Sequence, residues 1–413
     1  MITTCLAGPA KALLGLCVVS FLLPTSVATA EGPRSAALTS TYNVPPSIPA
    51  TCSASSPDET SALQAFFNSV PDGSTIVFPE GACYRVEGSL DLVDRNNLTF
   101  EGNGAILESF TDGTGFVQDL ATRYHVFCQG GTNLTFTGLA IEGTNTTHSY
   151  NPAYQDQAGF WVWGTEGLTL THDTVYDVLG DFVFLGPDTY NTWKWATNVT
   201  ISGDTFFGSG RQGIAITGAE NVSITGNRMS GAALSMFDIE PDSGTGPDVN
   251  GIPTYGGAAN ITISQNTIGK AGTTFLSAAG ADGTVTGVTV EDNSLVNQPM
   301  NMIIAGYATV PRSGFQIIGN TTTGNEFGSP LALVNLTYVN QAAVSGDVSP
   351  LYGPEDMTAV AVYGCHNVLV NGNQFPGATR YVSVDSGGWT GTPSSGIEVS
   401  NNQGQLPSNG RRS

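Results

Sequence analysis

The sequence contains few cationic residues. Three lysines and ten arginines stand against 34 aspartates and glutamates in 413 residues, which gives a net charge of −21. A field of this sign repels nucleic acid and anionic membrane surfaces, so we expect neither as a partner. Polyuronates are repelled in the same way unless a cation bridges them. The four histidines are scattered, and no Cys–His pattern indicates a zinc site.

Apolar runs long enough to span a membrane are also missing after residue 30. The first thirty residues contain one charge, Lys11, an apolar run from Ala12 to Pro24, and a small-residue segment that ends at Ala30. This pattern is typical of a cleaved secretory signal. We therefore expect residues 1–30 to be a signal peptide and the mature protein to be secreted and extracellular.

Cysteine is scarce in the chain that remains after cleavage. Cys52 and Cys83 flank the first predicted helix, and they can form a disulfide in an oxidising compartment. Cys128 and Cys365 lie in strand patterns far apart in the sequence, so we expect buried thiols there.

A short alternating phrase recurs along the chain. It begins with Asn, continues with an apolar, a polar and an apolar residue, and closes with a turn residue, at 97–103, 133–138, 198–204, 221–227, 260–266 and 367–373. A second set of short strands ends in Gly or Pro, at 160–164, 182–186, 214–218, 237–241, 302–306 and 360–364. Short strands that recur every few tens of residues are typical of a solenoid. We expect the closing Asn residues to stack as hydrogen-bonded ladders at the turns.

The rest of the chain divides around this repeat. Residues 31–52 are rich in Ser, Thr, Pro and Ala without periodicity, which predicts a flexible leader. Residues 58–67 have apolar residues at helical spacing, and a short helix there would cap the first coil. The solenoid domain is expected over residues 53–405, with a disordered tail over 406–413.

The capping segment at 58–64, the Phe-Pro-Glu-Gly turn at 78–81 and the repeat that follows resemble the right-handed parallel β-helix superfamily of pectate lyases and polygalacturonases. The resemblance covers residues 57 to about 400. It implies an all-β fold, a right-handed parallel β-helix of roughly ten rungs with a short N-terminal capping helix. It also implies an active-site groove across the outer face of one sheet, about midway along the solenoid.

Two segments resemble the rungs that carry Gly-Asp-Asp and Gly-His-Gly in polygalacturonases. Gly180-Asp181-Phe182 matches the first aspartate at Asp181, while Phe182 stands in place of the second. In Gly210-Arg211-Gln212-Gly213, Gln212 stands in place of the histidine. These departures argue against galacturonan hydrolysis itself.

Asp238 and Glu240 are the most informative pair of carboxylates. Two residues at i and i+2 of a strand point the same way, with Cα atoms about 6.5–7 Å apart. If Phe182, Phe184, Ile214, Ile216, Phe237 and Ile239 face the core, both carboxylates stand on the solvent face. Such a pair can supply a general acid and a general base, and mutual repulsion raises one of the two pKa values. The alternatives are a Ca²⁺ site completed by Asp242 or Asp248, or plain surface charge.

Further residues are candidates by their proximity in the repeat. Arg211 lies one rung before the pair, where it can orient substrate or form a structural ion pair, and Gln212 is a substrate-binding candidate. Asp181 can add a third carboxylate, although an aspartate at a strand entry is also a common turn residue. Asp188 and Asp242 are further substrate-binding candidates.

Trp161 and Trp163 are predicted to face outward by strand parity. Flat aromatic rings suit the apolar faces of sugars, so the two tryptophans are candidates for a sugar-binding platform. The alternative is a satellite core in which the long loop 144–157 covers them.

We therefore predict a monomeric, secreted glycoside hydrolase that acts on a polysaccharide. Asp238 and Glu240 would be the acid and base, Asp181 and Arg211 would assist, and no cofactor would be needed. Two alternatives stay open. One is a lyase or epimerase of polyuronates that uses Ca²⁺ and Arg211 as base, and the other is a glycan-binding surface protein without catalysis.

Overall fold

The computed structural model describes residues 40–113, 123–189, 191–192, 194–241, 256–280, 283–324, 332–350, 358–376, 378, 380–388 and 390–403. The predicted signal peptide and the predicted tail lie outside these residues. Strands dominate the described chain, with one α-helix, α1 (Thr60–Ser69), and one short 3₁₀-helix, η1 (Pro152–Tyr154). No helix among the described residues is long and apolar enough to cross a membrane.

The strands form three parallel sheets, named here A, B and C. Sheet A has 13 strands: β1 (Thr41–Asn43), β2 (Thr75–Val77), β5 (Asn96–Glu101), β8 (Thr132–Thr137), β11 (Glu166–Thr171), β14 (Ala196–Ser202), β17 (Gly218–Thr225), β20 (Gly257–Ser264), β23 (Thr284–Glu291), β26 (Arg312–Ile318), β29 (Val339–Ser345), β31 (His366–Asn371) and β33 (Ser395–Ser400). Sheet B has 9 strands: β3 (Cys83–Arg85), β6 (Ile106–Glu108), β9 (Ala140–Glu142), β12 (Thr174–Tyr176), β15 (Thr205–Ser209), β18 (Arg228–Ala232), β21 (Thr267–Ile268), β24 (Ser294–Val296) and β27 (Thr321–Thr323). Sheet C has 11 strands: β4 (Leu90–Val93), β7 (Val126–Gln129), β10 (Phe160–Trp163), β13 (Val183–Gly186), β16 (Ile214–Ile216), β19 (Phe237–Ile239), β22 (Leu276–Ala278), β25 (Met302–Ala305), β28 (Ala332–Thr337), β30 (Thr358–Tyr363) and β32 (Arg380–Val384).

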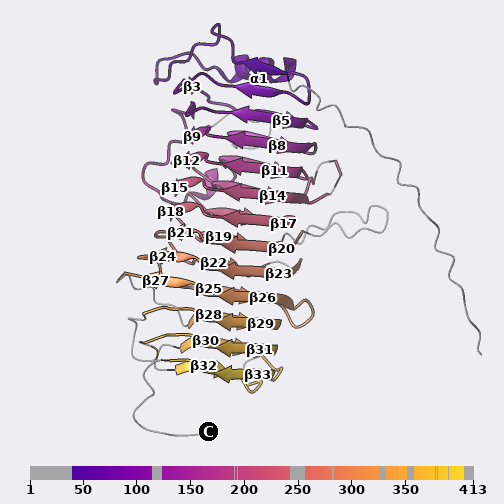
Figure 1. Ribbon diagram of the computed structural model, residues 1–413, viewed down its shortest axis with the longest axis vertical. Helices are drawn as coiled ribbons and strands as arrows, with labels where there is room; N and C mark the ends of the chain where they lie inside the picture. The colour runs from indigo at the N-terminus through magenta and orange to yellow at the C-terminus, as the bar shows by residue number, and fades with distance from the viewer. Residues whose placement is uncertain are drawn as a thin grey trace, which may run out of the picture. The chain divides into compact units, whose positions relative to one another are not determined.

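The chain visits the sheets in the order C, A, B, so that each coil adds one strand to each sheet over most of the solenoid (Figure 1). Alternation of side chains explains the coil: in β14, Val199 and Ile201 are buried while Asn198 is exposed. The predicted parallel β-helix of roughly ten rungs is confirmed by this arrangement, since sheet C contains 11 strands. The recurring phrases lie in sheet A, and the second set of predicted strands lies in sheet C.

The first Asn of each phrase has a left-handed backbone. Its φ lies between 54° and 58° at Asn97, Asn133, Asn198, Asn221, Asn260 and Asn367. Asparagine tolerates this conformation better than β-branched or bulky residues, which explains why the repeat begins with it.

The residues that close four of the phrases, Asp204, Asn227, Asn266 and Asn373, belong to a largely buried ladder of Asp and Asn side chains between sheets A and B. The backbone N–H of each member donates to the side-chain Oδ1 of the member one coil on, with N···O distances of 2.7–3.1 Å, along Asp173, Asp204, Asn227, Asn266, Asn293, Asn320, Asp347, Asn373 and Asn402. The predicted hydrogen-bonded ladder is thus confirmed. Three of its members are aspartates in place of asparagines.

Helix α1 lies over the first coils at the N-terminal end of the stack (Figure 1). Leu63 and Phe67 are buried, and the Phe67 ring meets Phe100 edge-on at 5.3 Å between centroids. The helix begins where Asp58 Oδ1 accepts the backbone N–H of Thr60 at 3.0 Å. The predicted capping helix is therefore present.

The segment predicted as a flexible leader is ordered from residue 40 onward. Strand β1 pairs in parallel with β2 in sheet A, and Val44 and Ile48 are buried in the main core. The ordered domain therefore begins by Thr41 rather than at residue 53. The missing periodicity in this segment reflects its single short strand.

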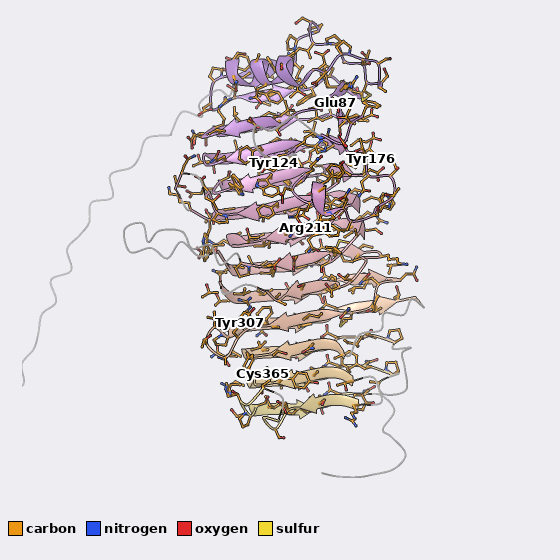
Figure 2. The ribbon with its side chains drawn as sticks, turned by 180° about the vertical axis from the view of Figure 1, so that it is seen from behind. Glu87, Tyr124, Tyr176, Arg211, Tyr307 and Cys365 are labelled. Carbon is orange, nitrogen blue, oxygen red and sulfur yellow. A yellow bond between two sulfur atoms is a disulfide. The ribbon has the colours of Figure 1, made fainter. Side chains whose placement is uncertain are left out.

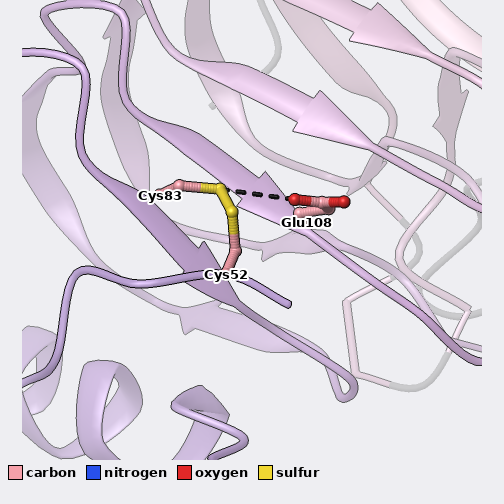
Figure 3. Close-up of side chains that lie close together, drawn as sticks. All are labelled: Cys52, Cys83 and Glu108. Carbon is pink, nitrogen blue, oxygen red and sulfur yellow. Dashed lines mark hydrogen bonds between the residues drawn. A yellow bond between two sulfur atoms is a disulfide. The ribbon is translucent and has the colours of Figure 1, made fainter. Parts of the chain in front are cut away.

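The predicted disulfide joins this segment to the solenoid. Cys52 and Cys83 are bonded, with their Cα atoms 5.3 Å apart (Figure 3). Cys128 and Cys365 are buried free thiols, as expected from the sequence.

Candidate active site

The candidate site lies on the outer face of sheet C. Parallel pairing places one side chain per strand in a single row across this face: Trp161, Phe184, Ala215, Asp238 and Ser277. Figure 2 shows Arg211 about midway along the stack of coils, with Tyr124 nearer to α1. The row brings the predicted carboxylate Asp238 next to the residues that precede β16.

One expectation about strand parity is wrong. Phe184 was expected to face the core, but it pairs with Trp161 and Ala215 on the outer face. The core-facing residues of β13 are Val183 and Leu185, and Phe182 at the preceding corner also packs in the core. Two successive residues at a corner can face inward because the chain turns there, and this shifts the parity of the strand by one residue.

The buried Asp181 forms an ion pair with the partly exposed Arg211. Arg211 Nη1 donates to Asp181 Oδ2 at 2.8 Å, and the Asp181 side chain is fully buried. Burial raises the pKa of Asp181 to about 7, although the guanidinium and the Gln212 N–H favour the carboxylate. Burial lowers the pKa of Arg211, but the Asp181 and Asp238 carboxylates outweigh it and raise that pKa overall. Asp181 thus positions Arg211 from below the surface, where it does not face a substrate.

Gln212 connects this ion pair to Asp238. Its backbone N–H donates to Asp181 Oδ1 at 2.8 Å, and its side-chain Nε2 donates to Asp238 Oδ2 at 2.8 Å. Its Oε1 accepts the backbone N–H of Ser235 at 2.7 Å. Both ends of the buried amide therefore bind protein groups, which favours a positioning role for Gln212, while its predicted contact with a substrate stays a prediction.

Asp238 lies on the outer face of sheet C, as strand parity predicts, but it is only 5% exposed, so it is covered rather than open to solvent. Burial and the negative charge of Glu240 raise the pKa of Asp238 to about 6, against the hydrogen bond to Ser277, the charge of Arg211 and the bond from Gln212. A carboxyl group with this pKa is protonated at mildly acidic pH, as a general acid requires.

Glu240 follows β19 directly and lies beside Asp238 and Arg211. Its charge acts on both, and its residue is half-buried, so it is more open to solvent than Asp238. Gly280 provides the space for its carboxylate, because a Cβ atom at Gly280 would lie 2.7 Å from Glu240 Oε1. The backbone φ of Gly280 is 110°, a conformation that other residues rarely adopt.

Sequence reasoning missed three residues of the site. Ser277 is hydrogen-bonded to Asp238 from the next strand, and Gly280 borders Glu240. Asp156 lies in the loop before β10. Burial raises its pKa, and the positive charge of the nearby Arg211 opposes this rise. The register of sheet C would have found Ser277, but no sequence signal marks Asp156, since its loop is long and irregular.

Asp188 lies apart from this cluster. Asp188 lies in the turn after β13, where it accepts bonds from Gln129 Nε2 at 2.8 Å and from the backbone of Asn191 and Thr192. These contacts indicate a role in the turn. Asp242 lies outside the described residues.

The predicted tryptophan platform forms a satellite core. Trp161, which is 5% exposed, stacks on Phe184 at 3.9 Å and on Tyr124 at 4.5 Å between ring centroids. Trp163 is partly exposed and packs against the same cluster, which Phe127 and Ala158 extend. Trp161 faces outward as strand parity predicts, but its ring is covered, so a satellite core forms here. Tyr124 and Phe184 provide the cover, whereas the alternative assigns it to the loop 144–157.

A group of side chains with metal-ligand spacing lies far from this site. Within the described part of the chain, the one such group of three or more is Cys52, Cys83 and Glu108. The Glu108 carboxylate lies 3.4 Å from Cys83 Sγ, and both sulfurs belong to the disulfide (Figure 3). Disulfide sulfurs are not thiolates, so the group lacks the ligands that a metal would need.

Comparison with known proteins supports the fold. A family model described as a right-handed β-helix region matches residues 86–330. No curated protein sequence matches the chain. Among solved structures, the chain is similar to an endo-xylogalacturonan hydrolase from Aspergillus tubingensis, with 15% identity, coverage of 89% of this chain and 94% of that one, and a TM-score of 0.54.

Two further solved structures show how varied proteins of this fold are. A surface adhesin of Streptococcus pneumoniae, PfbA, has 14% identity, coverage of 88% and 90%, and a TM-score of 0.59. The catalytic unit of an α-1,3-glucanase from Streptomyces thermodiastaticus has 15% identity, coverage of 90% and 69%, and a TM-score of 0.58. At these identities the similarity establishes the fold and leaves the activity to the site itself. Because the family model matches more than half of the sequence, the chain belongs to the right-handed β-helix family.

Proposed function

We propose that this protein is a secreted glycoside hydrolase that cleaves a neutral polysaccharide at the outer face of sheet C. The observation that carries the proposal is the pairing of Asp238, whose pKa is raised to about 6, with the more open carboxylate of Glu240 beside Arg211. The apolar N-terminal segment in the sequence supports export.

The proposed reaction uses the two carboxyl groups in different roles. Protonated Asp238 donates its proton to the glycosidic oxygen as the bond to the anomeric carbon breaks. Glu240 accepts a proton from the water molecule whose oxygen bonds to that carbon. Proton exchange with solvent then returns Asp238 to the acid form and Glu240 to the base form.

The charges around Arg211 favour a neutral substrate. Four carboxylates, those of Asp156, Asp181, Asp238 and Glu240, lie close to one guanidinium. When Asp238 is protonated, Asp181 with its pKa of about 7 is protonated as well, and the carboxylates of Asp156 and Glu240 still outnumber the single cation. A uronate would bring a further negative charge into this field, so a neutral sugar is the better fit.

The same contacts argue against the lyase alternative, in which Arg211 would remove a proton. A base must lose its own proton first, yet the neighbouring carboxylates raise the pKa of Arg211, and Nη1 is bound to Asp181. Arg211 is therefore better suited to holding a substrate oxygen or organising the carboxylates.

Glycan binding without cleavage is the second candidate function. The low exposure of Asp238 favours it, since a general acid must reach the glycosidic oxygen. The fold similarity to a surface adhesin is consistent with a binding role.

The test is an activity screen on neutral and acidic polysaccharides with the purified protein. New reducing ends and the ultraviolet absorbance of a conjugated double bond are followed together, because only β-elimination produces the second signal. The proposal predicts reducing ends without absorbance, lost in Asp238→Asn and Glu240→Gln but kept in the surface control Glu166→Gln. Retention on a polysaccharide column without cleavage would instead support the binding function.

A further inference from the structure

The amide of Gln212 has a fixed orientation, and this has a consequence for Asp238. The backbone N–H of Ser235 can only donate, and it points at Gln212 Oε1 at 2.7 Å. The oxygen of the amide must therefore face Ser235, and the NH₂ group must face Asp238. The backbone of Gln212 is held in turn by its bond to Asp181 Oδ1, so the whole residue is anchored.

The fixed NH₂ group makes Asp238 Oδ2 an acceptor at all times. Nε2 of Gln212 lies 2.8 Å from Asp238 Oδ2 and carries only donors on that side. The carbonyl oxygen of a protonated carboxyl group accepts a hydrogen bond better than its hydroxyl oxygen, so the Nε2–H donor favours Oδ2 as the carbonyl oxygen and Oδ1 as the oxygen that carries the proton. The Ser277 hydroxyl is also hydrogen-bonded to Asp238, but it can rotate between donor and acceptor and so adapts to either form.

We infer that Gln212 is a positioning residue, which holds Asp238 so that Oδ1 is the oxygen that carries the proton. The inference rests on the proposed function for its catalytic meaning, because Oδ1 would then be the atom that protonates the glycosidic oxygen. Gln212 also connects the Asp181–Arg211 ion pair to Asp238, because its backbone binds Asp181 and its side chain binds Asp238.

Other charged groups face Asp238 from each side. Glu240 follows the strand of Asp238, and Arg211 and Asp181 lie on the side of β16, while the group on the side of β22 is the neutral Ser277. A substitution at Gln212 leaves these surrounding groups in place, so its effect on the pKa of Asp238 can be measured separately. Removal of the Nε2–H donor weakens the ionised form of Asp238, so the pKa of Asp238 should rise.

The experiment follows Asp238 directly in the full-length protein. Aspartate carboxyl carbons are labelled, the Asp238 resonance is assigned by its loss in Asp238→Asn, and its titration is recorded by NMR. In Gln212→Met the pKa of Asp238 should rise by about one to two units, since a hydrogen bond to a charged group is lost. In the isosteric Gln212→Glu it should rise at least as far, because a second carboxyl group then faces Asp238.

A matched control uses a second buried glutamine–aspartate pair on sheet C. Gln129 Nε2 donates to Asp188 Oδ1 at 2.8 Å, so Gln129→Met removes the same kind of bond elsewhere. That variant should leave the Asp238 titration unchanged. Unchanged titration of Asp238 in both folded Gln212 variants would overturn the inference.

Kinetics add a readout that a purely structural role would not move. If the wild-type protein hydrolyses a polysaccharide, both Gln212 variants should lower kcat, leave KM nearly unchanged and move the alkaline limb of the pH profile upward. A wild-type protein without hydrolysis but with the predicted NMR shifts would refute the proposed function and keep the role of Gln212. Hydrolysis by the wild-type protein, together with an unchanged Asp238 titration in the Gln212 variants, would support the proposed function and refute the role of Gln212.

Discussion

Replacing Asp347 by Asn should stabilise the protein at neutral and alkaline pH. Asp347 is a buried member of the ladder, and its Oδ1 accepts the N–H and the side-chain amide of Asn320. Its Oδ2 is buried without a hydrogen-bond partner. In the neighbouring members, the corresponding atom is an amide nitrogen that donates to a backbone carbonyl, as Asn320 does to Val290 and Asn373 to Val344. An ionised Oδ2 in that position would face an acceptor, whereas a protonated one can imitate asparagine.

The magnitude follows from the shift in pKa. Burial raises the pKa of Asp347 to about 7, against hydrogen bonds from Asn320 and Ser345. The pKa of an aspartate in the unfolded chain is about 4. Each pKa unit of difference between the folded and unfolded states corresponds to about 1.4 kcal/mol of stability. Because the pKa of Asp347 is higher in the folded than in the unfolded state, the protonated side chain contributes fully to stability below about pH 4. This contribution declines as pH rises and is lost above about pH 7. The loss approaches about 4 kcal/mol above that range, and Asp347→Asn should abolish it.

The assay is urea unfolding followed by tryptophan fluorescence at about pH 5 and about pH 8. The stability gained by Asp347→Asn should be small at the lower pH and several-fold larger at the higher one. Asp292→Asn, an exposed aspartate near the same ladder, is the control and should change stability by no more than about 0.5 kcal/mol at either pH. A loss of stability, or an equal gain at both pH values, would refute the reasoning.

Three further predictions concern the site and its surroundings. Because the pKa of Asp238 is about 6 and the acid form is the active one, kcat should fall as pH rises through about 6, and a pH–rate profile that still climbs at about pH 8 would contradict this role. Arg211→Met leaves Asp181 buried without its cation and should cost about 3–5 kcal/mol at about pH 8. The cost should shrink below about pH 6, where Asp181 takes up a proton, and urea unfolding at the two pH values would show whether it does. Trp161→Ala empties the satellite core and should cost about 3–5 kcal/mol in the same assay, whereas the exposed Val296→Ala should change stability by no more than about 0.5 kcal/mol.

The repeat allowed most of the fold to be predicted from the sequence. In the phrases at 198–204, 221–227, 260–266 and 367–373, a left-handed Asn and a closing ladder residue mark the two ends of the repeated segment, so the positions of these sheet A strands follow from local chemistry. The orientation of Phe184 could not be predicted, because it depends on how the chain turns at the corner before β13. The alternation of apolar and polar residues in the sequence does not show where the chain turns at such a corner.

The site was predictable only in part, for a related reason. Arg211, Gln212 and Asp238 come together because consecutive coils stack in register, and the repeat implies this. The approach of Asp156 to Arg211 depends on the path of the long loop before β10, which local sequence does not determine. Roles such as that of Gln212 depend on hydrogen-bond direction, which only the three-dimensional arrangement supplies.

In the proposed function, Asp238 and Glu240 hydrolyse a glycosidic bond of a neutral glycan. The most direct test is mass spectrometry of the products formed from a neutral polysaccharide in heavy-oxygen water. The account predicts one heavy oxygen at each newly formed reducing end, with product formation lost in Asp238→Asn and in Glu240→Gln. Products that carry no label, or undiminished cleavage in either variant, would contradict it.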